Sequence, residues 1–146
     1  MKSLPQTEEQ RRFAKNVCRD ATRCCVYCGD WFQCRDHYVP QDWISYHRTF
    51  SAGDVVPACF ECNHLLLDVA KFSIPSRAGY LISRYESRAE KWLKVPPWSE
   101  KELAEMGYGM RKQIKRALML RSIYIAKLRN VDLCADGYDP IPIPIQ

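Results

Sequence analysis

The sequence predicts an α+β protein, in which a small strand–strand–helix core clamped by a structural zinc ion precedes a helical extension. Two observations favour this fold. The pairs Cys25/Cys28 and Cys59/Cys62 each have Cys-x-x-Cys spacing, and together they offer four thiolates, which complete a closed tetrahedral zinc site. The second half of the chain instead carries long segments with helical periodicity.

A chain of 146 residues can bury one modest hydrophobic core, which limits how many domains it can form. We expect residues 1–75 to hold an N-terminal helix and the zinc-clamped core, with its motif at 24–72, and residues 76–146 to form the extension. No apolar run approaches the roughly 18 residues that span a membrane. Residues 1–13 lack the apolar stretch of a secretory signal, so we expect neither secretion nor a membrane partner.

Eight cysteines can also indicate a disulfide framework, but the absence of a secretory signal and the metal-ligand spacing favour zinc. The cysteines outside the two pairs are interpreted as small, partly buried hydrophobic residues: Cys18, Cys24, Cys34 and Cys134. Cys24 adjoins Cys25 and is the one that could compete for the metal.

Local signals mark the elements of the first half. The segment from Thr7 to Gln10 fits a capping box, and the helix that it begins carries Phe13 and Val17 on one side, where it would cover the zinc-clamped core. Gly29 permits the backbone turn that a zinc knuckle needs. The core then reads as a strand over 31–39, a loop over 41–51, a strand over 55–58 and a helix over 63–72, which ends before Pro75.

The second half reads as helix from 76 to 94, with Pro96 and Pro97 ending it. A capping box begins a short helix whose inward residues are Leu103 and Met106, with Gly107 as its C-terminal cap, and a longer helix covers 110–131. The apolar face predicted for that longer helix comprises Met110, Ile114, Ala117, Ile125 and Leu128. Prolines alternate through the tail, 138–145, so it is extended and is either docked or disordered.

The net charge of +5 is small, but its distribution is uneven. Residues 107–131 contain no acid and seven basic residues: Arg111, Lys112, Lys115, Arg116, Arg121, Lys127 and Arg129. Such a face attracts phosphate backbones and releases counterions on binding. The alternative is a solvated basic helix face with no partner.

The dipeptide Asp36-His37 lies between the two cysteine pairs and is followed by Pro40. A neutral imidazole can take a proton from water near pH 7, and a carboxylate can hold a hard divalent cation. Phosphodiester hydrolysis needs both functions. The dipeptide becomes informative because of its position between two zinc knuckles.

These residues resemble the zinc-binding branch of the HNH endonuclease family. The likeness rests on four runs: Cys-Val-Tyr-Cys-Gly at 25–29, Asp-His-Tyr-Val-Pro at 36–40, Asp-Val-Val-Pro-Ala-Cys at 54–59, and Cys-Asn-His at 62–64. It covers about residues 24–72, and the motifs are specific jointly rather than singly.

The resemblance implies a ββα-metal fold and a cytoplasmic setting. It implies that His37 is the general base, and that Asp36 and Asn63 bind a catalytic Mg²⁺ or Mn²⁺ ion. His64 is the alternative to Asn63 as a cation ligand. Asp54 stands where the family has an Asn that orients the loop and the base. An ionised carboxylate can only accept hydrogen bonds, whereas an amide also donates them. Three roles are therefore open for Asp54: it holds the loop through backbone amides, it binds the metal, or it marks a weakened enzyme.

Three functions follow from these patterns. The first is a metal-dependent DNA endonuclease. The second is a zinc-containing protein that binds nucleic acid without cutting it. The third is a zinc-stabilised adaptor, in which the C-terminal helices and the Ile-Pro tail dock a protein partner.

Overall fold

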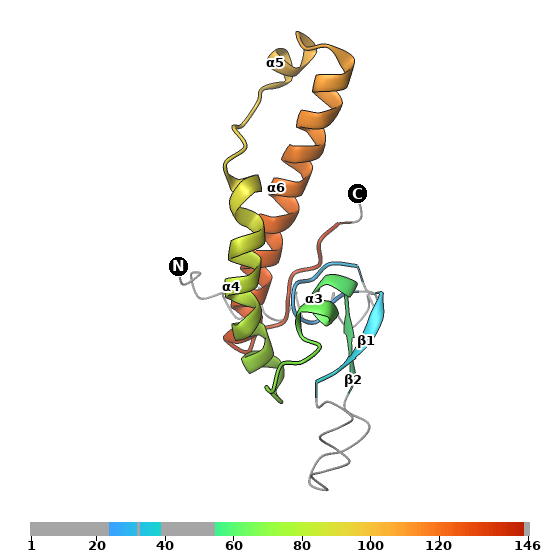
Figure 1. Cartoon of the computed structure of the whole chain (residues 1–146), viewed down its shortest axis with the longest axis vertical. Coiled ribbons are helices and arrows are strands. Elements are labelled where there is room, and N and C mark those ends of the chain that lie inside the picture. Colours follow the sequence, from blue (N-terminus) through green and yellow to red (C-terminus); the bar gives the residue numbers. More distant parts are fainter. Residues whose placement is uncertain (1–23, 32, 39–54, 145–146) are drawn as a thin grey trace, which may run out of the picture.

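The computed structural model of the protein describes residues 24–31, 33–38 and 55–144 (Figure 1). The predicted N-terminal helix, the predicted loop over 41–51 and Asp54 lie outside these residues. The described chain forms a small lobe beside a long helical hairpin, in an α+β arrangement. In chain order the elements are β1 (Cys34–His37), β2 (Val55–Ala58), α3 (Phe60–Leu65), α4 (Ile74–Leu93), α5 (Glu100–Ala104) and α6 (Tyr108–Ala135).

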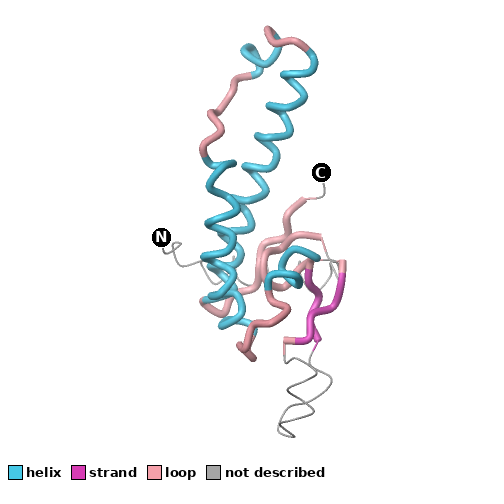
Figure 2. Tube along the Cα trace, viewed as in Figure 1, coloured by secondary structure: helices cyan, strands magenta, loops and turns pink. Residues whose placement is uncertain are grey.

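The small lobe, which we call the cysteine lobe, comprises the described residues between 24 and 66. Its strands β1 and β2 pair antiparallel, with Cys34 opposite Ala58 and His37 opposite Val55 (Figure 2). β1 is shorter than the predicted strand, since Trp31 pairs with Cys24 in an isolated bridge. Successive side chains of a strand alternate between faces, so Asp36 lies on one face of this sheet and His37 on the other.

Helix α3 begins at Phe60, three residues before the predicted start, because Cys59 caps it. The Cys59 Sγ accepts a hydrogen bond of 3.3 Å from the backbone N–H of Cys62. The helix ends at Leu65 rather than at the predicted residue 72, because the N–H of Val69 donates to the carbonyl of Leu66 and turns the chain toward α4.

Helix α4 also begins before its predicted start. The Ser73 side chain accepts a hydrogen bond from the N–H of Ser76, and proline lies in the first turn, where its missing N–H leaves no bond unmade. The buried face of α4 repeats every three or four residues, as an amphipathic helix requires, through Ala78, Leu81, Tyr85 and Ala89.

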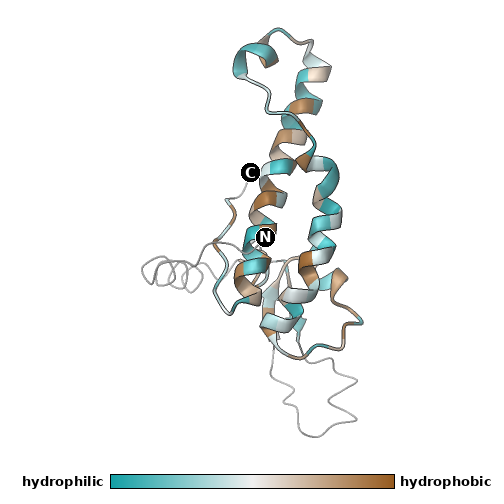
Figure 3. Ribbon diagram, turned by 90° about the vertical axis from the view of Figure 1, so that its left-hand side faces the viewer, coloured by the Kyte–Doolittle hydropathy of each residue, from teal (hydrophilic) through white to brown (hydrophobic). Residues whose placement is uncertain are grey.

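The capping box of α5 forms as predicted, with the Ser99 and Glu102 side chains each bonded to the other's backbone N–H, and Leu103 is buried. The C-terminal cap of α5 is Glu105, whereas Gly107, the predicted cap, is instead the N-cap of α6. Figure 3 shows α4 and α6 side by side, with hydrophobic and hydrophilic segments alternating along both helices.

The predicted apolar face of α6 is only partly covered: Ile114, Ala117 and Leu128 are half-buried, but Met110 and Ile125 are exposed. Met110 is 61% exposed and Ile125 is 42% exposed, although helical periodicity puts both on the inward side. The fully buried part of α6 is its C-terminal third, which contacts both α4 and the cysteine lobe. Its buried residues are Lys127, Asn130, Val131, Leu133 and Cys134. The prediction fails at Met110 and Ile125 because contacts with the lobe, rather than helical periodicity alone, decide which residues are covered.

The C-terminal tail is extended and docked against the cysteine lobe. The Asn130 amide donates to the carbonyls of Cys28 (2.8 Å) and Ile141 (2.7 Å), and its oxygen accepts from the N–H of Ile141. The N–H of Ile143 donates to the carbonyl of Gly29. These bonds show that the tail is docked, which is the first of the two predicted alternatives.

None of the helices that the structure describes combines the length and the apolar character needed to cross a membrane.

Candidate metal centre

The four predicted zinc ligands come together. Cys25 and Cys28 lie in the first turn of the cysteine lobe, Cys59 caps α3, and Cys62 lies within α3. Their Sγ atoms all lie within 4.8 Å of one another, and the four residues are at most 1% exposed. This cluster can hold a metal ion.

The donor set and its spacing fit zinc. Four sulfurs in a tetrahedral arrangement are typical of zinc or iron–sulfur sites, and zinc–sulfur bonds of about 2.3 Å place two sulfurs about 3.8 Å apart. The Cys28 and Cys59 sulfurs lie 3.6 Å apart. This pair of sulfurs is therefore spaced to bind one zinc ion.

Burial holds two thiols of the cluster protonated unless a cation is present. Burial raises the pKa of the Cys28 and Cys62 thiols, because a buried thiolate loses its hydration. Hydrogen bonds from the other three cysteines lower the pKa of the Cys59 thiol. A metal ion supplies the positive charge that lets all four ligands deprotonate.

The remaining described cysteines have other surroundings. The Cys24 thiol lies 3.5 Å from the carbonyl of Cys25, and Cys34 donates to the carbonyl of Ala58 at 3.4 Å. Cys134 is buried in the hydrophobic core, where burial raises its pKa to about 12. Cys24 does not join the cluster, so among the described residues it is not a competing ligand.

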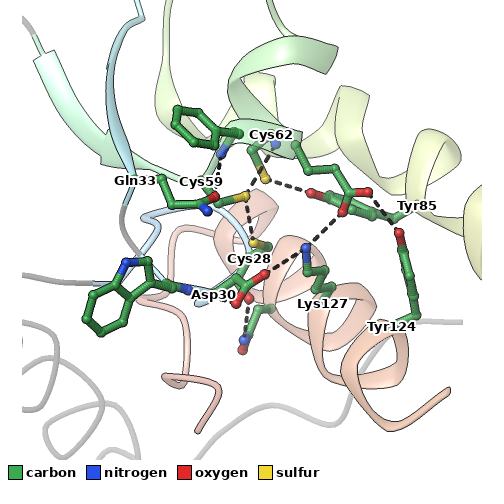
Figure 4. A network of polar contacts seen from close by, with 12 residues as sticks. Cys28, Asp30, Gln33, Cys59, Cys62, Tyr85, Tyr124 and Lys127 are labelled. Atoms are coloured by element: carbon green, nitrogen blue, oxygen red, sulfur yellow. Dashed lines mark hydrogen bonds and ion pairs between the residues drawn. The ribbon is translucent and has the colours of Figure 1, made fainter. Parts of the chain in front are cut away.

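Both long helices supply polar contacts around the cluster (Figure 4). From α4, the Tyr85 hydroxyl lies 2.9 Å from the Cys62 sulfur. From α6, the Lys127 ammonium lies 2.9 Å from the Asp30 carboxylate and 2.8 Å from the Glu61 carboxylate. These contacts attach the cysteine lobe to the hairpin immediately beside the predicted metal.

Lys127 is therefore not part of a phosphate-binding face, contrary to its place among the seven basic residues of α6. It is 5% exposed, and its ammonium lies over the rings of Tyr85 and Tyr124, 5.5 Å and 5.7 Å from their centroids. Burial lowers the Lys127 pKa, but the negative charges of Cys28, Cys59 and Glu61 outweigh burial and raise the pKa above its ordinary value. Lys127 thus stays charged and offsets negative charge beside the cluster.

Glu61 connects the lobe to both helices at once. Its second carboxylate oxygen accepts hydrogen bonds from Arg88 at 2.7 Å and from the Tyr124 hydroxyl at 2.8 Å. Burial acts to raise the Glu61 pKa, but the bond to Lys127 and the other donors lower it below its usual range. Sequence reasoning missed this role; the only local signal is the position of Glu61 inside the second Cys-x-x-Cys pair.

Asp36, the predicted cation ligand, forms a buried ion pair. Its two carboxylate oxygens lie 3.0 and 2.9 Å from an Arg77 terminal nitrogen, and the Tyr27 hydroxyl donates to it at 2.6 Å. Asp36 is 4% exposed and Arg77 is 1% exposed. Burial, followed by the charge of Asp36, raises the pKa of Tyr27, so its hydroxyl keeps its proton. A cation at Asp36 would have to compete with these donors.

The other predicted site residues are spread over the lobe. His37 is half-buried and ends β1, on the opposite face of the sheet from Asp36. Asn63 is half-buried and His64 is exposed, both in α3. In the described part of the chain, the four cysteines are the one group of three or more His, Cys, Asp or Glu side chains close enough to share a cation.

Comparisons of this chain with protein-family models, with curated proteins and with solved structures found no match. The likeness to HNH endonucleases therefore rests on the sequence motifs quoted above. The fold and the site define an α+β protein with a four-cysteine cluster that can hold a metal ion.

Proposed function

We propose that this protein is a zinc-stabilised endonuclease of the HNH type, which hydrolyses phosphodiester bonds in DNA. One observation carries the proposal: the described chain runs strand, strand, helix with four thiols gathered at its base, and His37 lies at the end of the first strand. This is the element order that the motifs imply.

In this proposal the zinc ion is structural, because four protein ligands leave no open position for water or substrate. The reaction therefore depends on His37, whose half-buried imidazole takes the proton of the attacking water. A catalytic Mg²⁺ or Mn²⁺ ion would neutralise the phosphate and the leaving oxygen. Its predicted ligands are Asp36 and Asn63, with His64 as the alternative to Asn63, and cation binding by Asp36 competes with the ion pair to Arg77.

A second candidate is a zinc-containing protein that binds nucleic acid without cutting it. The specific observation in its favour is that same ion pair. A carboxylate that accepts hydrogen bonds from Arg77 and Tyr27 already has its charge satisfied, which lowers its capacity to bind a divalent cation. In this candidate Asp36 has only a structural role.

The test is cleavage of a supercoiled plasmid by the zinc-loaded protein, with added Mg²⁺ or Mn²⁺ and with neither. We expect cleavage that needs the added cation, and we expect His37→Ala to lower the rate by about 10²–10⁴, the usual contribution of a general base. Zinc content and DNA affinity should stay unchanged in this variant, which separates lost chemistry from lost folding.

His64→Ala tests the alternative assignment, because His64 is an exposed histidine in the same lobe and the predicted alternative to Asn63 as cation ligand. Equal rates for His37→Ala and the parent protein would remove His37 from the mechanism. Loss of activity in the His64 variant alone would make His64 the important histidine. DNA binding by the parent protein without cleavage under any condition would establish the second candidate.

A further inference from the structure

We propose that the cleft between α4 and α6, next to the cysteine lobe, binds the sugar–phosphate backbone of a nucleic acid. This inference rests on the proposed function, in which the protein binds nucleic acid. It adds the cleft as the binding surface, which the sequence did not indicate. The cleft has a volume of about 730 Å³ and is walled by both long helices. Its α4 wall includes Arg88, Lys91 and Lys94, and its α6 wall includes Leu120 and Tyr124.

The α4 wall presents a row of cations. Arg88 and Lys91 lie three residues apart in α4, and Lys94 is the C-cap residue three positions further on, so neighbouring cations are about one turn apart. Glu90 is the one acid among the residues that line the cleft. Three cations against one acid give this wall a net positive charge, which attracts a backbone that carries one negative charge per nucleotide.

The partners that these cations have within the chain are exchangeable. Lys94 pairs with Glu90 at 3.2 Å, and both side chains are about 70% exposed, at 73% and 69%. Arg88 is 41% exposed and pairs with Glu61, which Lys127 and Tyr124 also hold. The Lys94–Glu90 pair is exposed on both sides and contributes little to stability, so a phosphate can replace Glu90 at small cost. Glu61 is only 19% exposed, and its bonds to Lys127 and Tyr124 hold it in place when Arg88 binds a phosphate instead. The cations can therefore engage a ligand without unfolding the chain.

Two aromatic residues, Trp92 and Tyr124, line the cleft. Trp92 is half-buried, and the Lys91 ammonium lies 4.6 Å from the centre of its ring. Tyr124 of α6 lines the same cleft. Aromatic side chains beside a cationic track are the combination that holds nucleic acids with little regard to sequence, because rings pack against sugars and bases while cations meet phosphates.

The basic end of α6 continues the same wall. Arg116 is four residues before Leu120, and Lys112 is four residues before Arg116, so the stripe that lines the cleft extends into exposed cations one and two turns further along. The cleft thus connects the basic part of α6 with the cysteine lobe and gives a nucleic-acid strand a continuous path between them.

The opposite side of the hairpin has the reverse character. A groove of about 450 Å³ there is lined by apolar residues such as Ile82, Leu93 and Ile125, and its charged residues are two acids, Glu86 and Asp132, against one base, Arg129. This groove offers no cationic track. The charge difference between the two sides assigns the nucleic acid to the side of the cysteine lobe.

The test is the double variant Lys91→Gln, Lys94→Gln in the full zinc-loaded chain. Its matched control is Lys101→Gln, Arg129→Gln, which removes the same charge from α5 and from the opposite groove. Affinity for a fluorescent mixed-sequence duplex is measured by anisotropy over a range of salt concentrations. Removing one lysine–phosphate ion pair should lower the slope of log K against log salt by about 0.9. The affinity of the cleft variant for the duplex should therefore fall by a factor of about ten or more near 0.1 M salt. The affinity of the control variant should fall much less.

Equal loss of affinity in the two double variants would overturn the proposal, because only total charge would then matter. An unchanged salt slope in the cleft variant would also overturn it. If polyglutamate competes with the duplex as well as unlabelled DNA does, the cleft binds an acidic protein instead. The same measurements distinguish failure of this proposal from failure of the proposed function. A parent protein that binds no DNA contradicts both. If the parent protein binds DNA and cleaves it through His37, and the cleft variant does both equally well, only the cleft proposal is contradicted.

Discussion

The cysteine lobe and the helical hairpin of α4 and α6 are built by different means. The lobe has elements of only four, four and six residues, and its centre is made of four cysteines and a buried tyrosine. The hairpin has helices of 20 and 28 residues that pack through Ala78, Leu81 and Val131. A unit as small as the lobe cannot bury enough apolar surface to fold unaided, whereas helices of this length gain stability from packing along one face.

This difference shows which contacts the stability of each part depends on. In the described part of the chain, four buried side chains of the hairpin make polar contacts with the lobe: Arg77 and Tyr85 from α4, and Lys127 and Asn130 from α6. Beyond these contacts, toward α5, Leu103 is the only residue from 90 to 126 that is buried. The lobe therefore depends on the hairpin for its polar partners, and the hairpin is best packed where the lobe covers it.

The largest effect should come from Cys59→Ser, which removes both a predicted metal ligand and the sulfur that caps α3. Structural zinc contributes about 10–16 kcal/mol of apparent binding free energy in small domains, so losing the metal should unfold the lobe. We expect metal analysis to show loss of zinc, and circular dichroism to show that much of the helical signal of α4 and α6 remains.

The control is Cys34→Ser, because Cys34 lies outside the four-cysteine cluster and should keep the metal. A Cys59→Ser protein with full zinc and an intact lobe would contradict the assignment of the cluster. Complete loss of helix in Cys59→Ser would instead show that the hairpin cannot fold without the lobe, which would remove the distinction between the two parts.

Arg77→Met breaks the junction from the α4 side and should have the next largest effect. It leaves the Asp36 carboxylate buried without its cation, and removing one partner of a buried pair costs about 3–5 kcal/mol. Urea unfolding of the zinc-loaded protein measures this cost. Arg84→Met is the control, since Arg84 is an exposed residue of the same helix that bonds to Tyr80 one turn away.

Adding Asp36→Asn to Arg77→Met should recover part of the lost stability, because the unpaired charge is then gone. If Arg77→Met lowers the free energy of unfolding no more than Arg84→Met does, the Asp36 carboxylate does not depend on its ion pair with Arg77. Asp36 can then bind a catalytic cation without a loss of stability.

Features set by neighbours in sequence could be predicted, and features set by distant neighbours could not. The spacing of Cys25, Cys28, Cys59 and Cys62 and the Ser99–Glu102 capping box are local patterns, and both appear in the structure. The pair of Asp36 with Arg77 joins residues 41 positions apart, and no local pattern distinguishes Arg77 from the other arginines.

The buried face of α6 shows the same limit. Helical periodicity says which residues share a side of a helix, but not which side a separate lobe will cover. Lys127 and Asn130 are polar and are buried because they meet the lobe, while the apolar Met110 extends past it into solvent. Charge counting along the sequence likewise could not separate the buried Lys127 from the exposed Lys112.

The smallest effect concerns the tail that closes over the lobe, and two glycines measure it. Gly29 and Gly137 both have positive φ, at 74° and 86°, so alanine is strained at each by about 1–2 kcal/mol. Only at Gly29 would the added methyl group collide, 2.5 Å from the Asn130 amide nitrogen and from the Ile141 carbonyl oxygen, whereas nothing lies within 4 Å at Gly137. Gly29→Ala should therefore lower the free energy of unfolding by about 1–3 kcal/mol more than Gly137→Ala, the usual cost of overpacking.

Hydrogen exchange at the Ile141 and Ile143 amides should also quicken in Gly29→Ala alone, since both amides donate to this junction. Equal destabilisation by the two substitutions, with the Ile141 amide still protected, would mean that the tail adds nothing to the attachment of the lobe.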